Sequence, residues 1–231
     1  MKYLNSIFSI LAALTLISLA GCATPEATVQ TGPDAETMND NLYKVDNSRV
    51  DESFIDPTVD FSRFDKIFIT QLDVSNVEVV ELRQTSARRV SWELTEQDLA
   101  MLQNIYAVSM NTQIFEEGGY QQATEAGENI LLLRIALKKI APTAPFDTAA
   151  NRGVGRTAYY TEGSGSLSIK GILQDGGSGE IIGLFADEHK SADFWGQNDR
   201  FHNRQDVKNI FNDWARLFRT KLDKIHGKSE K

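Results

Sequence analysis

A single cysteine, Cys22, stands in a chain of 231 residues. One cysteine cannot form an intrachain disulfide, so the fold must rest on a hydrophobic core even in an oxidising compartment. A Cys-x-x-Cys metal or redox motif is excluded for the same reason. The residues on either side of Cys22 therefore decide how much of the chain is available to build that core.

The residues before Cys22 have the composition of a signal peptide. Lys2 places a positive charge near the start, and residues 7–19 form an uncharged apolar run of 13 residues. A helix needs about 20 apolar residues to cross the core of a bilayer. A shorter run behind a basic residue is typical of a cleaved secretion signal, here residues 1–21.

The end of this signal, Leu19, Ala20 and Gly21 before Cys22, resembles the lipobox of bacterial lipoproteins. The resemblance implies cleavage before Cys22 and acylation of the cysteine, palmitate included, and two or three acyl chains hold a protein firmly on a membrane. Ala23 stands where an Asp would retain an enterobacterial lipoprotein at the inner membrane, which implies an outer-membrane, periplasm-facing location. The alternative is an ordinary secreted protein in which Cys22 happens to follow the cleavage site.

The mature chain that would begin at Cys22 has 210 residues, enough for one good-sized domain with a tail or for two small domains. Loss of Lys2 leaves 23 basic and 32 acidic residues, a formal net charge of −9. Excess negative charge disfavours nucleic acid and anionic lipid headgroups as partners. We therefore expect no nucleic-acid function.

Residues 22–59 are expected to form a lipidated acidic tether. They contain three prolines and eight acidic residues against only Lys44 and Arg49, with no sustained apolar period. A flexible coil of this length spans roughly 30–40 Å root-mean-square. The alternative is that residues 43–60 form an ordered arm, docked on the domain through Tyr43, Val45, Phe54 and Ile55.

Residues 65–74 are rich in β-branched and aromatic residues and predict a strand, which residues 77–82 extend or follow with a second short strand. Thr95 predicts a helix N-cap with an acidic residue three positions on, close to a capping box. The helix ends at Gly118 and Gly119. Its apolar face consists of Leu99, Leu102, Tyr106, Met110 and Ile114.

Residues 129–140 form the most apolar run of the mature chain and predict a central strand. Residues 166–173 and 180–186 predict a β-hairpin, and the glycines of residues 175–179 supply the positive φ angles that its turn needs. Residues 143–162 have no period and predict a loop. Loops of this length are often functional.

The last predicted element is an amphipathic helix from Asn203 to Gly227. Its apolar residues fall within an arc of roughly 140° on a helical wheel. Core packing is the expected role of this stripe, and a ligand slot is the alternative. The residues are Val207, Ile210, Phe211, Trp214, Leu217, Phe218, Leu222 and Ile225.

The order of elements is strand, helix, strand, two-stranded hairpin and helix. It predicts an α+β fold in which two main helices pack on one face of a mostly antiparallel sheet. The domain is expected to span residues 60–227, and residues 228–231 are a tail.

The order of segments over residues 54–225 resembles a family of Gram-negative bacterial lipoproteins that carry a domain of unknown function. The segments that carry the resemblance are residues 54–69, 94–120, 128–145, 165–189 and 211–225. The family implies no catalytic residue for this chain. The turn Asp-Gly-Gly-Ser-Gly stands where the family is expected to have Asp-x-x-Thr-Gly, which alters a turn and leaves the fold in place.

No catalytic signature is present in the sequence. A Gly-x-Ser-x-Gly elbow, a P-loop and a dinucleotide fingerprint are absent. The histidines lack the spacing of metal ligands, so neither a metal nor another cofactor is expected. They are His189, His202 and His226.

Two segments nevertheless contain candidate site residues. Asp187, Glu188 and His189, with Asp193 after them, form either an acid/base or cation site or a polar strand end followed by a solvated loop, with Trp195 under the sheet edge. The predicted loop at residues 143–162 is a candidate partner surface, because Arg and Tyr are enriched where interfaces gain their energy. Its residues of that kind are Arg152, Arg156, Tyr159 and Tyr160.

These features favour a non-enzymatic binding or scaffolding module, anchored through Cys22 and contacting an envelope protein or peptidoglycan. The alternative is a small-ligand binder or hydrolase that uses the loop at residues 152–160 and the segment at residues 187–199. A deep pocket that joins those two segments would favour the alternative, and a shallow surface would favour the binding module.

Overall fold

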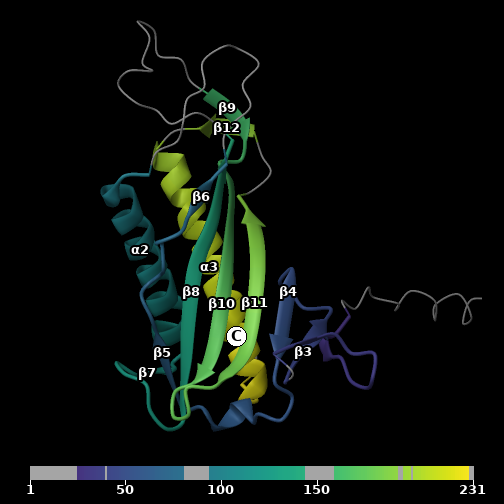
Figure 1. The fold of residues 1–231 in the computed structure, drawn as a ribbon. Helices are drawn as coiled ribbons and strands as arrows, with labels where there is room; N and C mark the ends of the chain where they lie inside the picture. Colours follow the sequence, from purple (N-terminus) through teal and green to yellow (C-terminus); the bar gives the residue numbers. More distant parts are fainter. Residues whose placement is uncertain are drawn as a thin grey trace, which may run out of the picture.

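The computed structural model describes residues 25–39, 41–80, 94–143, 159–191, 195–198 and 200–228. These residues form an open mixed sheet with the two long helices on one of its faces, as Figure 1 shows. The predicted α+β class is confirmed. Within this part of the chain, no helix is both long and apolar enough to cross a membrane.

Three long antiparallel strands make the centre of the sheet. They are β8 (Ile130–Pro142), β10 (Gly165–Asp175) and β11 (Ile181–Lys190). Successive side chains of a strand point to opposite faces. Every second residue of β8 is therefore buried under the helices: Leu131, Leu133, Ile135 and Leu137.

The tight turn between β10 and β11 needs glycine at two positions, for two different reasons. Gly179 has a positive φ of +77°. A side chain at Gly176 would meet the carbonyl oxygens of Ile130 at 2.7 Å and Gly127 at 2.8 Å. Asp175 accepts hydrogen bonds from the turn, and although burial opposes this, the amides of the two residues that follow Gly176 and the charge of Arg63 hold its pKa below the usual value.

The shorter strands complete the sheet, and some of them are parallel to β8. β5 (Lys66–Ile69) and β6 (Glu78–Val79) pair with β8, and β7 (Gln121–Gln122) pairs with the outer side of β5. A parallel pair needs a crossover, and the long segment between β5 and β8 supplies it with a helix.

Both predicted helices are present. α2 (Glu96–Met110) begins at the capping box of Thr95 and Asp98 and continues into the π-helical turn η2 (Asn111–Glu116). α3 (Arg200–Ile225) begins three residues before the predicted start. Most of its predicted apolar arc faces the core, where Ile210, Phe211, Trp214 and Leu222 are buried together with Ala215, but Ile225 at the end of the arc is exposed.

Residues 28–55 differ from the expected tether. They form β1 (Thr28–Val29), β2 (Thr37–Met38), β3 (Leu42–Asp46) and β4 (Glu52–Ile55), which we call the N-terminal arm. β4 pairs with β11, and Leu42 and Phe54 are buried. The 3₁₀ turn η1 (Phe61–Arg63) then leads into β5.

This segment contains few apolar residues, but two large ones, Leu42 and Phe54, are buried where the arm packs along the edge of β11. The sheet therefore begins well before the expected boundary at residue 60, and the alternative of an ordered arm describes this part of the chain.

A separate two-stranded ribbon lies beyond the end of the main sheet (Figure 1) and consists of β9 (Tyr159–Glu162) and β12 (Trp195–Asn198). The sequence predicted loops at both places. Trp195, expected under the sheet edge, is 72% exposed, because β12 pairs with β9 rather than with the main sheet.

Candidate functional site

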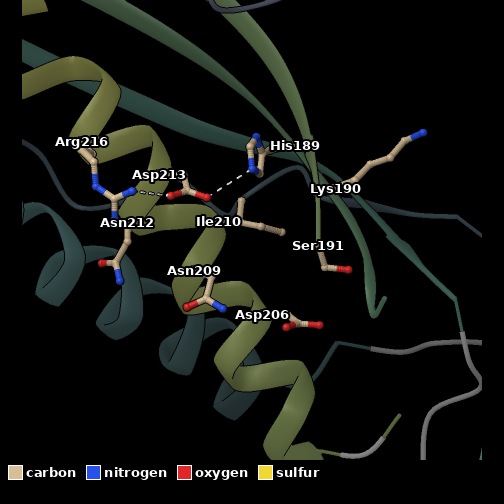
Figure 2. A pocket seen from close by; sticks show the side chains of 9 residues that line it. All are labelled: His189, Lys190, Ser191, Asp206, Asn209, Ile210, Asn212, Asp213 and Arg216. Carbon is tan, nitrogen blue, oxygen red and sulfur yellow. Dashed lines mark hydrogen bonds and ion pairs between the residues drawn. The ribbon is translucent and has the colours of Figure 1, made fainter. Parts of the chain in front are cut away.

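A pocket of about 310 Å³ lies between the end of β11 and the first half of α3 (Figure 2). Strand and helix each supply one wall, and most of the side chains are polar or charged. The residues that line it are His189, Lys190, Ser191, Asp206, Asn209, Ile210, Asn212, Asp213 and Arg216.

Strand alternation divides the predicted cluster of Asp187, Glu188 and His189 between the two faces of the sheet. Asp187 and His189 face α3, where they meet Trp214 and Asp213. Glu188 points to the opposite face. The three side chains therefore do not form one site, and Asp193 lies outside the described residues.

Asp187 is a structural residue. It is buried, and its Oδ2 accepts a hydrogen bond from Trp214 Nε1 at 2.6 Å while its Oδ1 accepts one from the Asp51 amide at 2.9 Å. Asp51 Oδ2 in turn accepts the Glu188 amide at 2.8 Å. These bonds fasten both the N-terminal arm and α3 to β11, so both oxygens of Asp187 are already in use.

Glu188 is held in its ionised form on the open face of the sheet. The Ser166 hydroxyl, which donates at 2.8 Å, is the main cause that lowers its pKa, and Ser168 and Lys139 add to the effect while partial burial opposes it. A carboxylate stabilised in this way is a poor general acid at neutral pH. Its contacts are those of a cross-strand pair.

Asp213 is the central charge of the pocket. Its Oδ2 lies 3.5 Å from His189 Nε2 and its Oδ1 lies 3.1 Å from Arg216 Nη1, as the dashed lines of Figure 2 mark. Lys190 points away from the helix in the same view. Arg216 partly neutralises this carboxylate and holds it in place beside His189, so this wall is suited to polar recognition.

Ser191 and Asp206 form the other side of the pocket. Ser191 Oγ accepts the backbone amides of Ser164 at 2.6 Å and Gly165 at 3.2 Å. Asp206 Oδ2 accepts the Ser164 hydroxyl at 2.5 Å. Within the described ranges no hydrogen bond joins Ser191 to His189, so the His189–Asp213 pair is not coupled to that hydroxyl as a nucleophile would require.

The geometry of the pocket offers groups for polar binding. In the part of the chain that the structure describes, no three His, Cys, Asp or Glu residues are grouped as metal ligands. Asp206 and Asp213 supply acceptors, and Arg216 supplies donors. A small polar molecule with both kinds of group would fit this lining.

The predicted partner surface is described only in part. Tyr159 and Tyr160 lie in β9, where their backbones pair with Asn198 and Gln197 of β12. The pairing brings the ends of the two predicted segments together, although the pocket draws on His189, Lys190 and Ser191 and on none of residues 159–162. Arg152 and Arg156 lie outside the described residues, as do Cys22 and the lipobox.

The helix wall of the pocket was missed by sequence reasoning. The amphipathic pattern of the terminal helix predicts only that its polar residues lie outside the apolar arc. The sequence signal that points to the pocket is the position of these polar residues on the flank of the apolar arc. A polar residue at such a flank faces whichever strand end the helix crosses, here the end of β11.

Comparison with known proteins identifies a family and several distant structures. The family model "Protein of unknown function (DUF3313)" matches residues 37–218. The PelC dodecamer from Paraburkholderia phytofirmans is similar at 11% identity and a TM-score of 0.35, covering 84% of this chain and 98% of that chain. A minor lipoprotein from Acinetobacter baumannii is similar at 10% identity and a TM-score of 0.33, covering 68% and 94%. These scores are too low to transfer fold or function. No curated protein matches the chain.

Proposed function

The chain belongs to the protein family DUF3313, whose function is unknown, and we propose that it is an envelope lipoprotein that works as a non-enzymatic binding or scaffolding module. Membership confirms the resemblance to a family with a domain of unknown function. The proposed anchor is the acylated Cys22, in the outer membrane and facing the periplasm because Ala23 follows it.

The observation that carries this proposal is the exposed Trp195 in the β9–β12 ribbon. Large aromatic residues are seldom this exposed, and Trp is among the residues that dominate binding energy at protein interfaces. The ribbon also contains the two tyrosines of the predicted partner surface. An exposed aromatic side chain of this size can be buried by a binding partner, which makes the ribbon suited to be a binding surface.

The ribbon lies at the end of the molecule away from the N-terminal arm (Figure 1). α3 runs between the two ends and its 26 residues measure about 39 Å. Lys224, near the C-terminal end of α3, forms an ion pair with Glu26, four residues after Cys22. A membrane anchor at one end would leave the ribbon free to meet an envelope protein or peptidoglycan.

The pocket beside Asp213 supports a second candidate, a binder of a small polar ligand. Its lining of carboxylates, amides and a guanidinium favours recognition over hydrolysis, since no hydroxyl among the described residues is coupled to His189. The two candidates use different surfaces, so they can be tested separately.

The anchor is tested first. Cys22→Ala removes the only cysteine, so labelling with a palmitate analogue should disappear and an uncleaved precursor should accumulate. Labelling that persists in this variant would refute the lipoprotein assignment.

The binding surface is tested by photo-crosslinking in cells. A photoreactive amino acid at Trp195 or Tyr160 should give a reproducible adduct with an envelope protein or with peptidoglycan. Val108, an exposed apolar residue of α2, is the control position and should give none. Equal adducts at all three positions would refute the ribbon as a specific binding surface. Absence of an adduct at the ribbon, together with a ligand that copurifies and is lost in Asp213→Asn, would favour the second candidate.

A further inference from the structure

The C-terminal end of α3 is basic although the mature chain is strongly acidic. Lys221 and Lys224 lie one turn apart on the helix, and Arg49 lies in the connection between β3 and β4 beside them. Figure 1 shows this end of α3 next to β3 and β4. We call Arg49, Lys221 and Lys224 the basic end.

Lys221 shows how closely the three charges are gathered. Burial lowers its pKa most, the charges of Lys224 and Arg49 lower it further, and only Glu26 acts in the opposite direction. Among the described residues, neither Lys221 nor Arg49 forms an ion pair, while Glu26 is occupied by Lys224. Two other positive charges and one carboxylate therefore act on Lys221, and that carboxylate is already paired with Lys224, which leaves the basic end able to accept an anion.

An exposed apolar side chain accompanies these charges. Ile225 is 41% exposed and follows Lys221 by four residues, so the two occupy the same face of α3. Basic residues beside exposed aliphatic ones are the composition of segments that lie in the headgroup region of a membrane.

The position of Glu26 sets the distance between the basic end and the membrane. Glu26 is the fourth residue after Cys22, and four extended residues span at most about 14 Å. An acylated Cys22 therefore keeps Glu26 within that distance of the bilayer, and the ion pair with Lys224 brings the end of α3 close to Glu26. The long tether expected from composition would have allowed the domain to stand much farther away.

We propose that the basic end binds anionic phospholipid headgroups of the membrane that holds the anchor, with Ile225 in the interfacial layer. The inference rests on the proposed acylation of Cys22. Each Lys or Arg near an anionic bilayer strengthens association about fivefold, and salt screens the effect. Net charge alone disfavoured such lipids, but the binding depends on where the charges lie. Contact at this end would orient α3 away from the membrane and present the β9–β12 ribbon outward.

The test measures headgroup contact of the acylated full-length protein in vesicles that contain phosphatidylglycerol. Acylation blocks Cys22, so Ile225→Cys provides a single thiol for an environment-sensitive fluorophore. Vesicles that carry a headgroup quencher should remove most of the fluorescence at residue 225. The same label in Val108→Cys, on α2, should remain bright.

Charge-reversal variants identify the cause of the contact. Arg49→Glu with Lys221→Glu should abolish quenching at residue 225. Arg204→Glu with Lys208→Glu makes the same change of net charge at the other end of α3, where both side chains are exposed, and should leave quenching intact. Vesicles of phosphatidylcholine alone should also abolish it.

Quenching that survives the Arg49 and Lys221 reversals, or that is equal in phosphatidylcholine, would overturn the proposal. Flotation of the vesicles separates this from failure of the anchor. Protein that floats without quenching at residue 225 refutes the basic end alone, whereas protein that does not float refutes the anchor and this orientation with it.

Discussion

The hydrogen bond between Trp214 and Asp187 is the contact whose loss we expect to be most informative. Trp214 is 6% exposed, its indole packs against Phe211 at 5.7 Å between ring centroids, and its Nε1 donates to the buried Asp187 carboxylate. Asp187 also receives the amide of Asp51. One side chain therefore joins α3, β11 and the N-terminal arm.

Trp214→Phe keeps an aromatic ring in place but removes the donor. A hydrogen bond to a charged group contributes about 1.5–3 kcal/mol, and the smaller ring leaves a cavity that adds about 1 kcal/mol. We expect Trp214→Phe to lower the free energy of unfolding by about 2–4 kcal/mol and Trp214→Ala by about 3–5 kcal/mol. A domain of this kind has a total of about 5–15 kcal/mol.

Urea unfolding followed by far-ultraviolet circular dichroism measures these losses without relying on tryptophan emission. Trp195→Phe is the matched control and should change stability by less than about 0.5 kcal/mol, because its side chain is exposed. In a double-mutant cycle with Asp187→Ala, the coupling energy should be at least about 1 kcal/mol. A Trp214→Phe loss below about 0.5 kcal/mol, or strictly additive losses, would refute the reasoning.

Three further outcomes are expected. A chain that begins at Asp60 lacks the N-terminal arm and should unfold at a lower urea concentration than the full mature chain, because the edge of β11 becomes exposed. Equal urea midpoints would show that the arm adds no stability, as expected of a tether. Asp175 has a lowered pKa in the folded protein, so it stabilises the fold above its ordinary value of 3.8 and that contribution is lost as the pH falls through the folded value. Asp175→Asn should accordingly be less stable at neutral pH and lose stability less steeply than the natural protein below about pH 4 in a urea titration. Gly176→Ala should cost about 1–3 kcal/mol through its clash with backbone oxygens, whereas Gly177→Ala should cost less because its nearest neighbour is the Asp175 side chain at 3.3 Å; equal thermal melting temperatures would show that the turn adapts.

The elements that could be predicted from the sequence are those with a long, uninterrupted period. α3 repeats its apolar arc from Val207 to Ile225, over about five turns, and β8 is apolar along most of its length, so each was recognisable without knowing its neighbours. The capping box at Thr95 is a local signal of the same kind, and it is confirmed.

The N-terminal arm could not be predicted in this way because its stability comes from β11, a distant partner. The split of Asp187, Glu188 and His189 was readable in principle from strand alternation. The pocket was not, because it depends on how α3 is rotated against the end of β11, and Asp213 reaches His189 only for that rotation. A periodic pattern gives the faces of an element but not the element that each face meets.

The clasp between Asp51 and Asp187 joins residues 136 positions apart, and this separation delays its formation during folding. Closing a loop of such length is entropically costly and slows folding. A chain exported with its N-terminus first presents β4 long before β11 has emerged, so the arm waits unpaired with Phe54 uncovered. The arm can dock only after β11 has emerged, and Glu26 can meet Lys224 only after α3 has followed, so the end of the domain nearest the proposed anchor is among the last parts to become native.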